Sequence, residues 1–210
     1  MVLRVRDSLR DAPGGVVGVL TSTAVLVPVV LVVALVMLLA AGLLLHDRAA
    51  AVGRASVGDT GPVLAGVELP ADGGAGPPTV VLAPEASGHP ESVAVRDLIQ
   101  RSTDARNARD YAAWTTTMTA DAVAGTSSAA FAAETRTQRV GSVTLRRIDP
   151  VGGGELVVPM GMVTTQDPAD APADVRVGRL CWQVGTVVTP DRGVLRIARV
   201  QPGSALRTPC

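Results

Sequence analysis

The stretch Leu180-Cys-Trp-Gln-Val-Gly-Thr-Val-Val188 carries a clear strand signal. Every second side chain from Leu180 onward shares one face, whereas Cys181 and Gln183 lie on the other. This period of two is typical of a β-strand, because successive side chains of a strand point to opposite faces. The sequence therefore predicts a long β-strand here, with Trp182 on its more apolar face.

Three further stretches alternate in the same way, and turn residues separate them. The predicted strands run approximately over 142–146, 156–162, 180–188 and 193–201. The connecting segments 149–154, 166–174 and 190–193 contain the Gly, Pro and Asp that turns favour, and Gly193 suits a left-handed position. We therefore expect antiparallel hairpins. Pro159 cannot donate to a ladder, which predicts a sheet edge or a bulge at that position.

Helical periodicity precedes the strands. A first helix is predicted from about Pro90 and Glu91, because its apolar positions recur every three or four residues. Those positions are Val95, Leu98, Ile99, Ser102 and Ala105. Asp110 is a good N-cap for a second, shorter helix that carries Tyr111, Trp114 and Met118 on one stripe. Ser127 or Ser128 caps a third helix around 129–137, with Phe131 facing inward.

Three helices followed by four antiparallel strands predict an α+β fold, with the helices on one face of a curved sheet. Two further segments add to the pattern: Asn107-Ala-Arg-Asp-Tyr111, with Trp114 close behind, and Leu195-Arg-Ile-Ala-Arg-Val200. Together these elements resemble the nuclear transport factor 2-like, cystatin-like cone fold over residues 91–202. The predicted domain is thus a cone of about three helices on a curved four-stranded antiparallel sheet, over residues 91–210.

Residues 12–45 form a run of thirty-four residues without a charge, and 25–45 is its densest apolar part. Those twenty-one residues rise roughly 31 Å as a helix, which matches a hydrocarbon core of about 30 Å. A cleaved signal peptide is the alternative, because Arg4, Arg6 and Arg10 form a basic leader. The apolar part of a signal peptide normally has about 7 to 15 residues, so the run length favours an uncleaved transmembrane helix.

The flanks of this predicted span indicate its orientation. Three arginines precede it and two, Arg48 and Arg54, follow it, which favours a cytoplasmic head over residues 1–11. The rest of the chain is then extracytoplasmic, at the plasma membrane. Residues 46–90 contain eight Gly and six Pro, so we expect a flexible linker there. The apolar islands 62–67 and 79–83 offer an alternative, in which one of them packs on the domain as an extra strand.

The cone resemblance implies several function classes. Enzymes such as ketosteroid isomerase and scytalone dehydratase need titratable groups that point into an apolar cavity. The histidines lie in the predicted linker, at positions 46 and 89, and Tyr111 sits on an apolar helix stripe. Asp121 and Asp149 fit caps or turns. We therefore predict no catalytic residue and a protein that is not an enzyme.

A short head, one span, a linker and a cone are similar to the layout of single-pass bacterial membrane proteins that serve as assembly modules. Examples are the accessory proteins of mammalian-cell-entry-type lipid transport systems and the inner-membrane subunits of conjugation machines. This resemblance implies a scaffold or accessory role in an envelope complex, with protein partners and no cofactor. The alternative is a domain that binds a small apolar ligand, in a pocket lined by Trp114, Met160, Met162 and Trp182.

Composition argues against other sites. The formal net charge is zero, and the chain holds one Tyr and one Phe, which disfavours nucleic-acid binding. No CxxC or HExxH spacing supplies a metal site, and Gly152–Gly154 lacks the Lys of a phosphate loop. The two cysteines lie beyond the predicted span, so we predict a disulfide between Cys181 and Cys210. Unpaired thiols or an intermolecular bridge through Cys210 are the alternatives.

The predicted topology gives a direct test. A reporter that is active only outside the cytoplasm, fused after Cys210, should be active, because the span exports everything from residue 46 onward. The same reporter fused after Arg10 should be inactive. Sequencing the N-terminus of the membrane-bound protein checks the anchor, since a mature protein that begins near Ala51 would contradict it.

Overall fold

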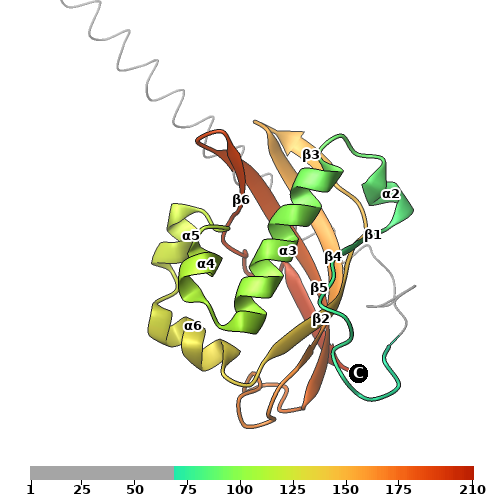
Figure 1. The fold of residues 1–210 in the computed structure, drawn as a ribbon, viewed down its shortest axis with the longest axis vertical. Helices are drawn as coiled ribbons and strands as arrows, with labels where there is room; N and C mark the ends of the chain where they lie inside the picture. The colour runs from blue at the N-terminus through green and yellow to red at the C-terminus, as the bar shows by residue number, and fades with distance from the viewer. Residues whose placement is uncertain (1–68) are drawn as a thin grey trace, which may run out of the picture. The chain divides into compact units, whose positions relative to one another are not determined.

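A computed structural model describes residues 69–210, which form an α+β domain with five helices and one strongly curled, mixed sheet (Figure 1). The helices are α2 (Pro84–Ser87), α3 (Ser92–Ala108), α4 (Tyr111–Thr115), α5 (Ala120–Ala124) and α6 (Ser128–Thr135). The strands are β1 (Val81–Leu82), β2 (Arg139–Leu145), β3 (Asp149–Gly152), β4 (Glu155–Thr165), β5 (Arg179–Asp191), β6 (Val194–Ile197) and β7 (Ala205–Pro209). The α+β class predicted from the sequence is confirmed.

The antiparallel pair β4–β5 is the centre of the sheet. Its register runs without a break from Leu156 opposite Val188 to Thr165 opposite Arg179. The outer side of β4 pairs with β2 and β3, and the outer side of β5 pairs with β6 and β7. Strand β1 adds to β2 in parallel, so the sheet is mixed and not purely antiparallel.

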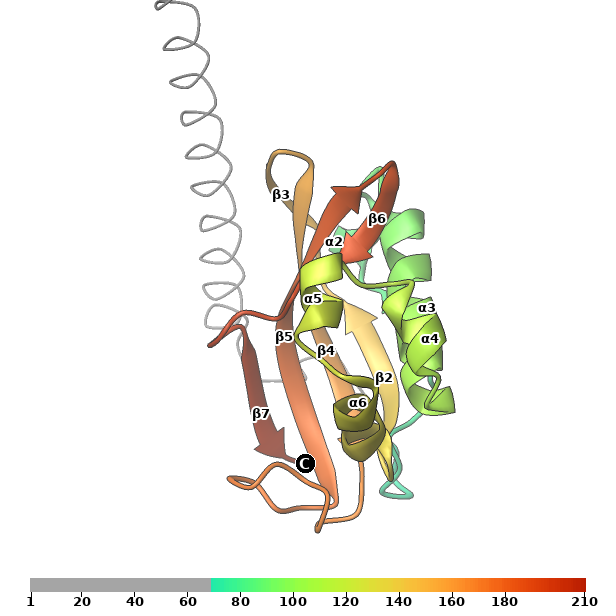
Figure 2. The same ribbon diagram turned by 90° about the vertical axis from the view of Figure 1, so that its left-hand side faces the viewer.

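The helices lie on one side of the curled sheet, which we call its inner face (Figure 2). The main core forms where the apolar stripe of α3 meets this face. Val95, Leu98 and Ile99 of α3 pack in one buried cluster with side chains of β2, β4, β5 and β6. The strand members of this cluster include Val143, Leu145, Val158, Met160, Val184, Val188 and Ile197. The apolar face predicted for the helix and the apolar face predicted for the strands therefore pack against each other.

Two amide side chains of α3 bind neighbouring backbone. Asn107 Nδ2 donates to the carbonyl of Val140 at 2.9 Å, and the Val140 N–H donates to Asn107 Oδ1 at 2.8 Å. Gln100 does the same for the segment before β1, since it accepts from Val80 N at 2.7 Å and donates to Pro78 O at 3.1 Å. These bonds hold both the start of β2 and the N-terminal segment of the described domain, residues 75–80, against α3.

The linker predicted over 46–90 needs a correction in its last part. Val80 and Ala86 are buried, and residues 81–82 form a strand that pairs with β2. The domain therefore begins well before residue 91, because the island 79–83 extends the sheet at the otherwise open edge of β2. This is the extra-strand alternative. Residues 46–68 lie outside the described part of the chain.

The predicted helix count of three and strand count of four are both too low for the described residues. The additional helices α2 and α5 have four and five residues, too short for a helical period to appear in the sequence. The additional strands β1, β3 and β7 have two to five residues. Each is too short to show an alternation of its own, and each is a strand because it hydrogen-bonds to the edge of a longer strand.

Pro159 was predicted at a sheet edge or a bulge, but it lies in β4, which has strands on both sides, and the β4–β5 register is unbroken there. Its position explains why a central strand tolerates it. Residues of β4 up to Val157 pair with β3, and those from Met160 onward pair with β2. Pro159 falls in the gap between these two partners, where its carbonyl accepts from Arg146 N at 2.9 Å and no ladder needs its missing N–H.

Several local predictions are confirmed. Asp110 caps α4 by accepting from Ala113 N at 2.9 Å, and Ser127 caps α6 by accepting from Ala130 N at 3.1 Å. Gly193 adopts a φ of 83° in the β5–β6 turn. These are local signals, and local chemistry is sufficient to produce them.

The predicted disulfide is also confirmed. Cys181 and Cys210 are bonded, with their Cα atoms 5.6 Å apart. Cys181 lies within β5 opposite Thr208, and Cys210 directly follows the last residue of β7. The bridge therefore joins the C-terminus of the chain to the central strand pair.

The predicted membrane span and cytoplasmic head lie outside the described residues. Between residues 69 and 210, no helix has the length and apolar character needed to cross a membrane.

The register of β2 against β4 shifts between Gly141 and Thr144, where Ser142 adopts a φ of 47°. Such a bulge bends a strand and increases its twist. At the bend, residues 75–77 approach β2 closely. The Ser142 N–H donates to Pro77 O at 2.8 Å, and the Ser142 hydroxyl donates to Ala75 O at 2.9 Å. A Cβ atom at Gly141 would lie 2.3 Å from the carbonyl oxygen of Gly76.

This close approach predicts that Gly141→Ala destabilises the domain by about 1–3 kcal/mol, the usual cost of overpacking. The new methyl group would overlap backbone atoms, which cannot rotate away. Gly88→Ala is the matched control, because a Cβ there meets nothing within 4 Å and its φ is −75°. Urea denaturation of the full-length variants measures both, and equal unfolding midpoints for the two would contradict the prediction.

Candidate functional site: a cavity between the sheet and the helices

A cavity of about 710 Å³ lies between the inner face of the sheet and the helices. Its lining includes exposed residues such as Gly125, Arg199 and Val200, so it reaches the surface. The remaining lining comes from α3, α4, α5, α6, β2, β4, β5, β6, β7 and the loops between them, including the loop that joins β4 to β5. The cavity is the candidate functional site.

The strand register arranges the sheet side of the cavity in rows. Met162, Trp182 and Arg207 are directly opposite one another on β4, β5 and β7, and they form one row. Met160, Val184 and Ala205 form the next row, two residues further along. Both rows line the cavity. The Trp182 indole N–H donates to Thr164 Oγ1 at 2.9 Å, which fixes the ring over β4.

The helix side contains one face of α3 and an aromatic cluster. Ile99, Ser102, Thr103 and Arg106 line the cavity at the i, i+3, i+4, i+7 spacing of one helix face. Trp114 lines it from α4 and packs against Phe131, with ring centroids 5.1 Å apart, and against Tyr111 at 5.7 Å.

The four residues predicted to line a pocket all border this one cavity. Met160, Met162 and Trp182 come from the sheet, and Trp114 comes from the helices. Their role in ligand binding stays a prediction. Asp121 and Asp149, interpreted as cap or turn residues, bind close neighbours: Thr119 Oγ1 donates to Asp121, which lies in the first turn of α5, at 2.6 Å, and Arg147 donates to Asp149 at 2.6 Å.

Sequence reasoning missed the polar end of the cavity. Arg106 Nη2 donates to Glu134 and to Gln138, each at 2.8 Å, and these three residues line the cavity. Arg106 lies one helical turn beyond Ser102, so extending the α3 stripe would have found it. Its partners lie about 30 residues away in sequence, and no local spacing signals them.

Arg207 is the second missed residue. Its guanidinium lies over the Trp182 ring, 5.4 Å from the centroid, which is a cation–π arrangement. Its Nη2 donates to both carboxylate oxygens of Asp174, at 2.7 and 2.9 Å. This hydrogen bonding lowers the pKa of Asp174, with a smaller contribution from the charge of Arg207. Arg207 lies in β7, beyond the last strand predicted from the sequence.

Two buried polar atoms of lining residues have no hydrogen-bond partner in the described part of the chain: Arg207 Nε and Gln166 Oε1. The amide of Gln166 is oriented by its other end, because Nε2 donates to Val177 O at 2.9 Å. A buried donor or acceptor without a partner is unfavourable. The fold itself therefore leaves one donor and one acceptor of the lining residues unpaired.

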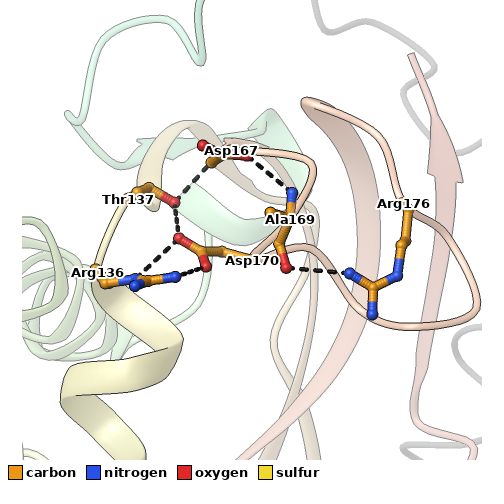
Figure 3. Close-up of polar contacts among 6 residues, drawn as sticks. All are labelled: Arg136, Thr137, Asp167, Ala169, Asp170 and Arg176. Atoms are coloured by element: carbon orange, nitrogen blue, oxygen red, sulfur yellow. Dashed lines mark hydrogen bonds and ion pairs between the residues drawn. The ribbon is translucent and has the colours of Figure 1, made fainter.

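Figure 3 shows how the loop between β4 and β5 is anchored to Arg136 and Thr137, the two residues that follow α6. Arg136 donates from Nε and Nη2 to the two carboxylate oxygens of Asp170, and Thr137 Oγ1 donates to Asp170 at 2.8 Å. Thr137 in turn accepts from Asp167 N at 3.1 Å, and Arg176 binds the Ala169 carbonyl. The hydrogen bonds from Arg136, and then from Thr137, hold the pKa of Asp170 below its ordinary value.

Within residues 69–210, no group of three His, Cys, Asp or Glu side chains is arranged to hold a metal ion. The expectation that the protein has no metal site and no cofactor stays a prediction.

Comparison with known proteins gives no relative. No family model, no curated protein and no solved structure matches the chain. The resemblance to a cone therefore rests on the arrangement of the elements, which supports the coarser description of helices on one side of a curled mixed sheet.

The Asp170 anchor predicts a measurable titration. By carboxyl ¹³C NMR, the pKa of Asp170 should lie below the ordinary value of about 3.9, and Arg136→Gln should raise it. Because the folded-state pKa is lowered, the anchor contributes stability above the ordinary pKa and loses it as the pH falls through the folded value. Arg192→Gln is the control, since that side chain is 94% exposed and its ion-pair partner is Asp191, not Asp170. A pKa that Arg136→Gln leaves unchanged would contradict the assignment.

Proposed function

We propose that residues 69–210 form a non-catalytic, extracytoplasmic domain that binds a small, mainly apolar molecule. The single observation that carries this proposal is the cavity of about 710 Å³. Ligand sites typically have volumes of roughly 300–1,000 Å³ and combine apolar walls with a few polar groups. This cavity has both, because Trp182, Met160 and Val184 lie beside a polar end that contains Arg207.

The nature of the walls supports an apolar ligand. Methionine side chains adapt to irregular shapes, and a Trp ring offers a large flat contact area. Met160, Met162 and both tryptophans of the chain line the cavity. A ligand that covers these side chains gains about 25 cal/mol for each Å² of apolar surface removed from water.

The charged groups of the lining favour binding over catalysis. A general base that works near neutral pH needs a raised carboxylate pKa, which apolar surroundings provide. Here Asp170 has a lowered pKa because Arg136 and Thr137 donate to it. Glu134 accepts from Arg106. Both lining carboxylates are thus held as ion-pair partners.

The disulfide supports an oxidising, extracytoplasmic location for the domain, because such bonds persist mainly outside the cytoplasm. The membrane anchor stays a prediction from residues 12–45. The scaffold role and its protein partners also stay predictions. The large exposed apolar side chains of the described residues are Leu69, Val81, Val93, Val194, Val200 and Leu206, and they come from separate segments. The cavity therefore gives the ligand-binding proposal its stronger support.

Both tryptophans line the cavity, so their indole ¹H–¹⁵N signals report directly on its occupation. Butylbenzene, a small apolar probe, should shift both signals saturably in the full-length protein held in lipid nanodiscs. Free probe concentrations are measured in a dialysate, because the lipid also takes up the probe.

Val184→Phe should weaken this binding at least about tenfold by filling the cavity. Val194→Phe is the matched control, because Val194 is 52% exposed and lies outside the lining, and it should bind like the unaltered protein. A titration that leaves both indole signals unmoved up to the solubility limit of the probe would contradict the proposed function.

A further inference from the structure

We propose that the ligand is uncharged and carries a hydrogen-bond acceptor, of the carbonyl type, that accepts from Arg207. This inference rests on the proposed function and adds the chemical class of the ligand. An ester, a ketone or an amide on an apolar body belongs to this class. A free carboxylate does not.

The position of Arg207 is the first argument. It is directly opposite Trp182 on the neighbouring strand, and its guanidinium lies over that ring. Both residues line the cavity, as do Met162 and Val184 beside Trp182. An apolar ligand body that packs on Met162 and Val184, beside Trp182, therefore brings its end next to the guanidinium.

The unused donors of Arg207 are the second argument. A guanidinium has five N–H donors, and Asp174 accepts from Nη2 alone. Nε is buried and has no hydrogen-bond partner in the described part of the chain. Nη1 also has no partner among the described residues and, unlike Nε, keeps accessible surface, so an acceptor oxygen on the ligand can accept from it.

The charge balance is the third argument, and it distinguishes a carbonyl from a carboxylate. Asp174 already balances the charge of Arg207. The cavity lining also contains the carboxylates of Glu134 and Asp170 and the unpartnered Oε1 of Gln166. Because Glu134 and Asp170 are themselves paired with Arg106 and Arg136, a ligand carboxylate would meet no unpaired positive charge at this end, whereas a neutral carbonyl needs only a free donor of Arg207.

The other lining arginines do not change this balance at Arg207. Arg106 is bound to Glu134 and Gln138. Arg199 is exposed and follows Ala198, which bonds to Val187. Val187 lies five residues from Trp182 along β5, about 17 Å at the rise of a strand. The charge of Arg199 therefore acts at the opening of the cavity and not at the Arg207 end.

Three probes of matched size test the inference with the full-length protein in nanodiscs: butylbenzene, butyrophenone and 4-propylbenzoate. The indole signals of Trp114 and Trp182 measure binding at known free concentrations. Butyrophenone should bind at least about tenfold more tightly than butylbenzene, which is the effect of one hydrogen bond to a charged donor. The benzoate should bind more weakly than the ketone.

Two variants assign the effect to its source. Arg207→Met keeps an unbranched stem over Trp182 and removes the donors, so the preference for the ketone over butylbenzene should disappear while butylbenzene still binds. Asp174→Asn leaves the Arg207 charge unbalanced, so the affinity for the benzoate should rise relative to the ketone. Arg192→Met is the control and should keep the original order of affinities.

The outcomes separate the two proposals. If no probe binds, the proposed function and this inference both fail. If butylbenzene and butyrophenone bind equally, or if the benzoate binds most tightly to the unaltered protein, the cavity is a ligand site but the inference is wrong. If Arg207→Met retains the ketone preference, the acceptor lies elsewhere and the inference is likewise overturned.

Discussion

The unbroken pairing of β4 with β5 is the constraint on which the rest of the domain depends. Ten consecutive residues of each strand are in register, from Leu156 with Val188 to Thr165 with Arg179. Because side chains alternate along both strands, this register decides at once which residues face the helices. A shift of one residue would replace Trp182 and Met162 on the inner face by Cys181 and Gly161. The core, the cavity lining and the disulfide partner are all consequences of this single alignment.

The cavity follows from the way the two outer edges of this pair are used. On the β4 side, the bulge between Gly141 and Thr144 bends β2 toward the N-terminal segment and away from a flat sheet. On the β5 side, pairing passes from β6 to β7, with single bonds from Gly185 N to Ser204 O and from Ala198 N to Val187 O between them. The sheet therefore curls, and α3 packs closely against part of its inner face. Trp114 and its aromatic partners lie over the remainder, where the cavity forms.

Much of the fold could be predicted from the sequence because its signals are local. Asp110 and Ser127 cap helices through their own backbone neighbours, and the alternation around Trp182 needs no knowledge of a partner strand. Strand β7 could not be predicted in this way, and β1 appeared only as an alternative. Two or five residues carry little periodicity, and each becomes a strand only because β2 or β5 presents an open edge. The apolar wall of the cavity was predictable for the same reason as the strands. Its polar end was not, because Arg207 meets Asp174 across 33 residues of sequence.

The disulfide connects the predicted location of the domain to its candidate site. Strand β7 is a five-residue edge strand that pairs with β5, and elements with so few contacts open locally most easily. It supplies Ala205 and Arg207 to the cavity wall, so fraying would remove the guanidinium from the Trp182 ring. The bond from Cys210 to Cys181 closes a loop of 29 residues, for which the chain-entropy model gives roughly 3–4 kcal/mol. That bond lies one residue along β5 from Trp182 and three residues along the chain from Arg207. In an oxidising compartment this bond would stabilise the wall of the cavity itself, so the proposed binding function depends on the covalent bond that is consistent with an extracytoplasmic location.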